Sequence, residues 1–400
     1  MTKKINVLTF STDLHFGGDE NRILTLARSI DVSRFNHLVV TINRADAETD
    51  QPFGTMRQQF AEAGIEVIDL GEIHSKSKPA VRPVQLARTT RVLVRVIKKL
   101  ARLVRGRDID LIDAHTSANQ IGILAGVLTR TPTVVTLYGH EQRLLPRLSS
   151  PVILGMADAI VTDSQAICNR MKRWLIRPEL KTHVIPNGMS PPSTTRDRAE
   201  MMKKLGLPGD PNTQVIGQVS AFVPYKGHRV LLAAARSVLE KASNTAFLLV
   251  GYSRDSDSYK EHLEQEIADM GMSDRVRILD YPGHIGDVWK AIDIHVHASL
   301  IDSLPNAIIE SMSLAKPAVA TSVGGIPEMV EHEKTGLIVP PGDPDALAQA
   351  LLRLLREPEM AQRLGKAARN RYQKRYRPEV MTRKLESLFT DLVRRKNFAI

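Results

Sequence analysis

The chain has 400 residues, more than one hydrophobic core usually supports, so two domains are expected. Hydrophobic residues make up 42% and charged residues 25%, which is typical of a soluble globular protein and excludes a low-complexity chain. The net charge of +11 favours anionic partners, but aromatic residues make up only 4% and are not interleaved with basic ones, which argues against nucleic acid. The single cysteine, Cys168, excludes an intrachain disulfide.

The beginning of the chain predicts no secretory leader. Residues 5–10 form an apolar run that is too short for one and is typical of a strand. No apolar run reaches the ~18 residues that a transmembrane helix needs. We therefore expect a cytoplasmic protein.

Short apolar runs alternate with helical patterns through the first half of the chain. Residues 20–30 and 117–128 show helical spacing. The alternation predicts βαβ units and a parallel sheet covered by helices. The predicted strands are Ile5–Phe10, His37–Ile42, Ile65–Leu70, Asp110–Ala114, Thr133–Leu137 and Ala159–Thr162.

A basic segment lies within this half. Residues 82–107 hold nine lysines and arginines, and apolar residues such as Val96, Leu100 and Val104 recur there at helical spacing. Two interpretations remain open. The segment is either a solvated helix that packs one face on the core, or a helix whose basic face also contacts anionic phospholipid at the inner face of the membrane.

Proline and glycine residues separate the two halves. Pro186, Gly188, Pro191 and Pro192 cannot continue a helix or a central strand. The second half then repeats the alternation of strands and helices. Its predicted strands are Val215–Val219, Ala246–Val250, Val276–Leu279, Ile294–His297, Ala318–Thr321 and Gly336–Val339.

The end of the chain is expected to be helical after Pro344, with Pro358 and Pro378 starting new helices. We therefore predict an α/β protein with two doubly wound domains. Their predicted bounds are 1–190 and 191–376, and a C-terminal helix, 377–400, is expected to pack back toward the first domain.

Two carboxylates are the most informative feature of the second half. Asp302 lies on a loop after a predicted strand, and Glu310 lies on a helix predicted over residues 306–314. Two acids so placed can accept hydrogen bonds from two parts of one polyhydroxylated ligand.

A lysine and two glycine pairs complete the pattern. Lys226 follows a strand on a tight loop, where its ammonium group can neutralise a phosphate. Gly17-Gly18 and Gly324-Gly325 each precede a predicted helix, where the missing Cβ lets backbone amides approach phosphate oxygens. Carboxylates for hydroxyls and a lysine with glycines for phosphate predict a nucleotide-sugar site in a cleft between the two sheets.

These motifs resemble the retaining glycosyltransferases of family 4, the group 1 glycosyl transferases, and they occur in the order of that family. The family has the GT-B architecture, in which two Rossmann-like domains face each other across a cleft. The motifs are Gly17–Glu20, Asp110–His115, Ile185–Gly188, Pro224–Gly227, Asp302 with Glu310, and Gly324–Glu328.

The resemblance implies a role for each residue. Lys226 would contact the donor diphosphate, Glu310 the ribose hydroxyls, and Asp302 and His115 the donor sugar, so that His115, Lys226 and Asp302 are the candidate catalytic residues. The glycines expected at the donor site are Gly17, Gly18, Gly324 and Gly325. No cofactor and no metal are expected, because Lys226 can neutralise the leaving phosphate.

The chain departs from the family pattern at three positions. Ala221 stands where many relatives have an arginine that contacts phosphate, and Arg254 or a backbone amide is a candidate to replace it. Asp302 stands where most relatives have a glutamate, which is one methylene longer. Tyr138 stands where a histidine is common, with His140 two residues later.

Two pairs of residues look like metal ligands but have ordinary explanations. Asp108 and Asp110 form an Asp-x-Asp pattern, but they open a strand that leads to His115. His295 and His297 would point to one face of a strand. Further ligands are not evident, so we interpret these histidines as packing or cleft-lining residues.

The sequence therefore predicts a retaining transferase that moves a sugar from a nucleoside-diphosphate sugar to an acceptor hydroxyl. The acceptor would be a glycan or a lipid-linked sugar in cell-surface glycan or glycolipid synthesis. Two alternatives stay open. A nucleotide-sugar epimerase would turn over the donor without an acceptor, and a non-catalytic subunit would bind the nucleotide sugar without transfer.

Overall fold

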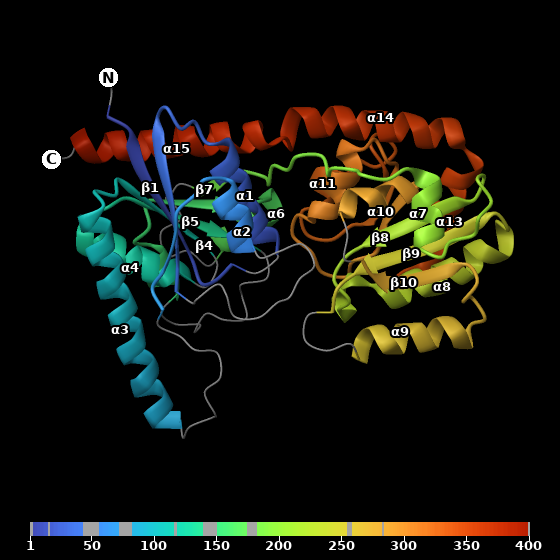
Figure 1. Cartoon of the computed structure of the whole chain (residues 1–400), viewed down its shortest axis with the longest axis horizontal. Coiled ribbons are helices and arrows are strands. Elements are labelled where there is room, and N and C mark those ends of the chain that lie inside the picture. Colours follow the sequence, from blue (N-terminus) through green and yellow to red (C-terminus); the bar gives the residue numbers. More distant parts are fainter. Residues whose placement is uncertain are drawn as a thin grey trace. The chain divides into compact units, whose positions relative to one another are not determined.

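The computed structural model describes residues 3–14, 17–42, 56–71, 82–115, 118–138, 150–173, 182–253, 258–281 and 284–398. The chain forms two compact units (Figure 1). Unit 1 comprises Met1–Gly188 and Pro378–Ile400, and unit 2 comprises Met189–Arg377. The predicted boundaries at residues 190 and 376 lie within two residues of the ends of these segments at Gly188 and Arg377.

Unit 1 contains a seven-stranded parallel sheet with the strand order β3-β2-β1-β4-β5-β6-β7. Its strands are β1 (Ile5–Ser11), β2 (Phe35–Thr41), β3 (Val67–Asp69), β4 (Leu111–His115), β5 (Thr133–Leu137), β6 (Ala159–Thr162) and β7 (Thr182–Val184). Its helices are α1 (Gly18–Ser29), α2 (Met56–Glu62), α3 (Arg82–Gly106), α4 (Asn119–Thr129), α5 (Ser150–Leu154), α6 (Gln165–Lys172) and α15 (Pro378–Phe398).

The two faces of this sheet are covered by different helices, because successive side chains of a strand point to opposite faces. Leu8 and Phe10 of β1 pack with residues of α3 and α4. Val7 of the same strand packs on the other face with α1 and with α15, which contributes Phe389. The C-terminal helix α15 is therefore part of the core of unit 1.

Unit 2 contains a six-stranded parallel sheet with the order β10-β9-β8-β11-β12-β13. Its strands are β8 (Gln214–Val219), β9 (Thr245–Gly251), β10 (Val276–Asp280), β11 (Ile294–His297), β12 (Ala318–Thr321) and β13 (Leu337–Val339). Its helices are α7 (Arg198–Lys204), α8 (His228–Lys241), α9 (Ser258–Asp269), α10 (Ile285–Ala291), α11 (Asn306–Ser313), α12 (Ile326–Met329), α13 (Pro344–Arg356) and α14 (Pro358–Arg375), with a 3₁₀ turn, η3 (Pro224–Lys226).

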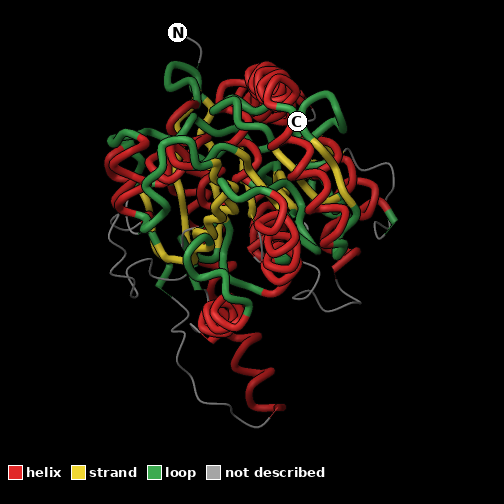
Figure 2. The backbone as a smooth tube through the Cα atoms, turned by 90° about the vertical axis from the view of Figure 1, so that its right-hand side faces the viewer, coloured by secondary structure: helices red, strands yellow, loops and turns green. Residues whose placement is uncertain are grey.

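The same two-sided packing is found in unit 2. Phe247 and Leu249 of β9 pack against α8, α9 and α13, whereas Leu248 packs against α7 and α10. Figure 2 shows helices on the outside of the strands. The predicted doubly wound α/β architecture is confirmed in both units. Pro344, Pro358 and Pro378 each begin a helix, as the sequence predicts.

In both sheets the strand order reverses at one position, between β1 and β4 in unit 1 and between β8 and β11 in unit 2. Doubly wound sheets bind ligands beyond the carboxyl ends of the strands at such a point. Gly17 and His115 lie at this point in unit 1, and Lys226 and Asp302 lie there in unit 2.

Candidate functional site

The loop after β8 places Lys226 close to the loop after β11. Lys226 ends the turn η3, and Gly227 follows with a φ of +71°. A Cβ at Gly227 would lie 1.9 Å from the carbonyl oxygen of Ala298, so only glycine permits this approach of the two loops. Gln218 joins them, since its amide donates to the Lys226 carbonyl and accepts from the Ala298 N–H.

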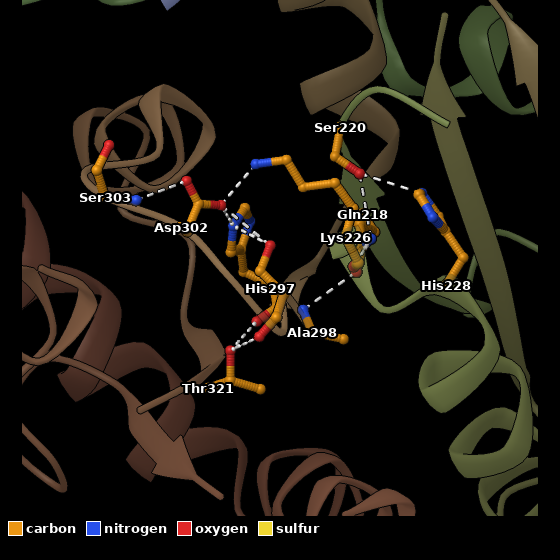
Figure 3. Close-up of polar contacts among 10 residues, drawn as sticks. Gln218, Ser220, Lys226, His228, His297, Ala298, Asp302, Ser303 and Thr321 are labelled. Carbon is orange, nitrogen blue, oxygen red and sulfur yellow. Dashed lines mark hydrogen bonds and ion pairs between the residues drawn. The ribbon is translucent and has the colours of Figure 1, made fainter. Parts of the chain in front are cut away.

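Lys226 and Asp302 form an ion pair within unit 2 (Figure 3). The lysine Nζ lies 2.6 Å from Asp302 Oδ2, and the two side chains are 14% and 5% exposed. Burial acts to raise the pKa of Asp302, but Lys226 and His297 outweigh it and hold this pKa well below its usual range. Asp302 is therefore ionised at neutral pH, close to an ammonium group.

His297, at the end of β11, also contacts Asp302. Its Nε2 lies 2.9 Å from Asp302 Oδ2 and 3.0 Å from Ser299 Oγ. Burial lowers the pKa of His297, so the imidazole is neutral at pH 7 and donates from Nε2 to the carboxylate. The sequence predicted only a packing or cleft-lining role. His297 and Asp302 are five residues apart in the sequence, and this short spacing was the hint that their side chains meet.

The glycine pair after β12 meets the same loop. Gly324 has a φ of +53°, and a Cβ there would lie 1.9 Å from the carbonyl oxygen of Asp302. The N–H of Gly325 donates to the carbonyl of Ser303 at 2.7 Å. Gly324 and Gly325 therefore hold the Asp302 loop. The N–H of Gly325, which was predicted to approach phosphate, donates to the protein backbone instead.

Glu310 lies in α11 and has a different environment from Asp302. Its Oε2 accepts a hydrogen bond of 2.8 Å from Nε1 of Trp289, a fully buried residue of α10. Burial raises the pKa of Glu310 to about 7, although the bond from Trp289 opposes this. No local pattern pointed to Trp289, because its contact with Glu310 depends on how α10 and α11 pack.

The structure also shows the surroundings of Ala221 and Tyr138, two residues that differ from the family pattern. Ala221 is buried, and its methyl group cannot replace an arginine at a phosphate. Arg254 and His140 lie outside the described residues. Tyr138 is buried in unit 1, where its hydroxyl lies 3.5 Å from Nδ1 of His115.

His115 ends β4 and belongs to a buried polar cluster of unit 1. Its Nε2 lies 3.0 Å from Oδ2 of Asp113. Burial acts to raise the pKa of Asp113, but His115, Arg22 and His37 together outweigh burial and lower this pKa. Both nitrogens of the His115 ring therefore have neighbours within unit 1. The sequence pattern did not point to Asp113 as a site residue.

Arg22 is a second missed residue of unit 1. It is 2% exposed, and its Nη1 donates to the Ile185 carbonyl at 2.9 Å and to Asn187 Oδ1 at 2.8 Å. Arg22 thereby ties α1 to the Ile185–Gly188 motif. Gly17 is the N-cap of α1 and Gly18 its first residue, so the helix predicted over residues 20–30 begins at Gly18.

The Asp-x-Asp pattern has a structural role in unit 1. Oδ2 of Asp110 accepts the N–H of Asn6 at 2.9 Å, and the Asp108 carbonyl accepts from the Asn6 side chain. Within the described ranges, no three histidine, cysteine or acidic side chains gather as metal ligands would.

The structure thus brings four predicted residues into one network in unit 2, namely Lys226, Asp302, Gly324 and Gly325. Glu310 follows on the adjacent helix but bonds to Trp289. His115, Gly17 and Gly18 lie in unit 1. A pocket of about 470 Å³ lies elsewhere in unit 2, where it is lined by Thr213, Thr245 and Arg275 near the amino ends of the strands. Arg275 there donates to the carbonyls of Leu239 and Ser243.

Comparisons with known proteins agree with this architecture. A family model described as "Glycosyl transferases group 1" matches residues 197–371, and one described as "Glycosyltransferase Family 4" matches residues 16–191. Together they span most of both units.

The chain is also similar to individual proteins. It is 23% identical over 306 residues to N-acetyl-alpha-D-glucosaminyl L-malate synthase of Bacillus anthracis, covering 74% of this chain and 78% of that protein. It is 26% identical over 311 residues to UDP-Gal:alpha-D-GlcNAc-diphosphoundecaprenol alpha-1,3-galactosyltransferase of Escherichia coli, with coverage of 74% and 78%.

Among solved structures, the chain is similar to Alr3699/HepE of Anabaena in complex with UDP and glucose. The TM-score is 0.78 at 22% identity, and the match covers 96% of this chain and 99% of that chain. This likeness shows the fold. With the two family models, it establishes that the chain belongs to the group 1 glycosyltransferases, enzymes of the two-domain GT-B fold.

Proposed function

We propose that this glycosyltransferase moves a sugar from a nucleoside-diphosphate sugar to an acceptor hydroxyl, with retention at the anomeric carbon. One observation carries the proposal. The ammonium of Lys226 lies beyond the carboxyl ends of β8 and β11, at the point where the strand order reverses. A cation at that point suits the diphosphate of a nucleotide.

The side chains of unit 2 suit the parts of such a donor. Lys226 neutralises the charge that develops on the leaving diphosphate, which is the task of a metal in other transferases. The carboxylate of Glu310 has open acceptor positions for the two ribose hydroxyls, because Trp289 is its only hydrogen-bond partner among the described residues. Lys226 thus suits the diphosphate of the donor, and Glu310 suits its ribose.

Retention follows when the acceptor attacks from the face that the nucleotide leaves. The leaving phosphate oxygen then accepts the proton of the acceptor hydroxyl, so no side chain is needed as a base. The protein contributes positioning and charge stabilisation.

The printed names of similar proteins suggest the first substrates to try. One solved structure holds UDP and glucose, and one relative transfers galactose from UDP-Gal to a sugar on diphosphoundecaprenol. We infer a UDP-sugar donor and a lipid-linked acceptor at the cytoplasmic leaflet, in cell-surface glycan or glycolipid synthesis. Among the described helices, none offers an apolar stretch that could span a bilayer.

A transfer assay tests the proposal. UDP-glucose and UDP-galactose are incubated with the protein and with N-acetylglucosaminyl-diphosphoundecaprenol, and the anomeric configuration of the product is read by proton NMR. Retention predicts an α-linked product from an α-linked donor. A β-linked product would contradict retention. Conversion of donor to its epimer, or binding without transfer, would support the epimerase or the non-catalytic subunit, which the comparisons do not favour.

A further inference from the structure

The carboxylate of Asp302 is surrounded by internal hydrogen-bond donors. Its Oδ2 lies 2.6 Å from Lys226 Nζ, 2.9 Å from His297 Nε2 and 3.0 Å from Ser299 Oγ. Its Oδ1 accepts the N–H of Ser303 at 3.0 Å. A carboxylate offers about four acceptor positions, so little capacity is left for a sugar hydroxyl.

Asp302 and Glu310 therefore differ, although they are the two acids of one motif. The carboxylate of Glu310 receives one hydrogen bond from the described part of the protein, whereas the carboxylate of Asp302 receives four. The shorter aspartate also reaches one methylene less far than the glutamate found in most family members. Because it has more internal hydrogen bonds and a shorter side chain, the Asp302 carboxylate is held within the protein and away from a ligand.

Lys226, in contrast, uses few of its hydrogen-bond donors within the protein. Its ammonium group has three N–H donors, and one of them is used on Asp302. The Nζ atom also lies 5.6 Å from the centre of the Tyr225 ring, within the range of a cation–π contact. Asp302 can therefore fix the direction of the lysine and still leave two N–H groups for phosphate oxygens.

We propose that Asp302 is a positioning residue that holds the Lys226 ammonium toward the donor diphosphate, and that it does not contact the donor sugar. This inference rests on the proposed function, since it assigns a nucleoside diphosphate to Lys226. It replaces the sugar contact that the family resemblance implies for Asp302.

The surroundings of Asp302 are built to hold it in place. The neutral His297 donates to it, and Ser299 Oγ lies within 3.0 Å of both groups. Thr321 Oγ1 in turn donates to the Ser299 carbonyl at 2.6 Å (Figure 3). Gly324 packs against the backbone of Asp302 itself. The carboxylate therefore has a fixed place in unit 2 before any donor binds.

A double-mutant cycle tests the proposal, because two residues that act through one contact do not have additive effects. UDP and UDP-glucose are titrated by calorimetry into the wild type, Lys226→Ala, Asp302→Asn and the double variant. GDP or ADP with its glucose derivative is used instead if the wild type prefers that base. Asp302→Asn should weaken binding of both ligands by the same factor, roughly 10- to 100-fold, the usual range for a charged hydrogen bond. In the Lys226→Ala background it should change neither affinity.

Asp293→Asn is the matched control. Asp293 pairs with Arg198 at 2.8 Å just before β11, at the end opposite to Asp302. Its variant loses an ion pair of the same unit and should leave both affinities unchanged. A fall in both affinities there would assign the effect of Asp302→Asn to general destabilisation and overturn the proposal.

Two other results would also overturn the proposal. Loss of affinity for UDP-glucose alone, kept in the Lys226→Ala background, would mean that Asp302 contacts the sugar. A gain in UDP affinity would mean that Asp302 competes with phosphate for the lysine. If the wild type binds none of the three diphosphates or their glucose derivatives, the proposed function fails instead.

Should Asp302→Asn not fold, labelling of Lys226 with an amine reagent in Ser299→Ala gives a second measurement. Mass spectrometry should show faster labelling than in the wild type, because the anchored carboxylate is loosened. An unchanged labelling rate would contradict the anchoring of Lys226 through Asp302.

Discussion

The indole N–H of Trp289 donates to Oε2 of Glu310 over 2.8 Å, so a fully buried aromatic residue fixes one oxygen of the carboxylate proposed to bind ribose. The other oxygen has no hydrogen-bond partner among the described residues. Burial raises the pKa of Glu310 from 4.5 to about 7. The charge of this group therefore changes near physiological pH.

Donor binding should depend on pH through Glu310. The ionised carboxylate accepts hydroxyl hydrogen bonds better than the protonated acid, so affinity for the nucleotide should rise as pH increases from about 6 to 8. Calorimetry across this range measures the effect. Glu310→Gln should bind more weakly and show no such rise, and a rise that persists in the variant would assign the titration to another group.

The stability of unit 2, unlike its affinity for the nucleotide, should fall as the pH increases. The unfolded chain loses the Glu310 proton near pH 4.5 and the folded chain near pH 7, so the contribution of this group to stability falls between these values. Glu310→Gln keeps an acceptor for Trp289 and removes this loss. Its unfolding midpoint should lie several degrees above that of the wild type at pH 8 and match it at pH 4, since each kcal/mol shifts the midpoint of a unit of this size by about 2–4 °C. An equal change at both pH values would contradict the pKa assignment.

Lys226→Ala should lower turnover by ~100-fold or more, because it removes the charge directed at the leaving diphosphate. Asp302 keeps its bonds from His297, Ser299 and Ser303, so the loop should stay folded. Steady-state rates with donor and acceptor measure the effect. Lys241→Ala, at the exposed end of α8, is the control and should be fully active. Near-normal transfer by folded Lys226→Ala would mean that another group stabilises the phosphates.

Transfer should survive EDTA. The reason is that Lys226 supplies a positive charge at the diphosphate, where a divalent cation acts in other transferases. Rates are measured after dialysis against EDTA and again after addition of Mg²⁺ or Mn²⁺. A complete loss that either metal restores would contradict the assignment of the diphosphate to Lys226.

The sequence predicted those parts of the fold that local patterns encode. β11 and β12 are continuous buried runs, and their bounds match the prediction. β7 was missed, because Thr182–Val184 is short and only half buried. The loops carrying Lys226 and Asp302 were foreseen because parallel strands end at one edge. The contacts of Asp302 with His297 and of Glu310 with Trp289 were not, since they depend on how loops turn and helices pack.

Charge reversal on α3 tests the predicted membrane contact. Arg91, Arg95, Lys98 and Arg102 are exposed in the structure, while Val96 and Leu100 are buried in unit 1. Each cation near an anionic surface contributes about 1 kcal/mol, and salt screens it. The wild type should therefore float with vesicles that contain phosphatidylserine at low salt and leave them at high salt.

Replacing those four residues by glutamate should abolish flotation and preserve nucleotide binding. The matched control reverses four exposed cations of α14 and should still float. These control positions are Lys366, Arg369, Lys374 and Arg375. A wild type that stays unbound at low salt would leave α3 as a solvated helix.

The most direct measurement of the central claim is thermal unfolding of the whole chain with UDP-, GDP- and ADP-sugars. A bound donor stabilises the folded state by mass action. One nucleotide series should raise the unfolding midpoint of the wild type in proportion to the logarithm of its concentration, and Lys226→Ala and Glu310→Gln should lose most of this shift. If no series raises the midpoint, or if both variants keep the full shift, the donor does not bind at Lys226 and Glu310.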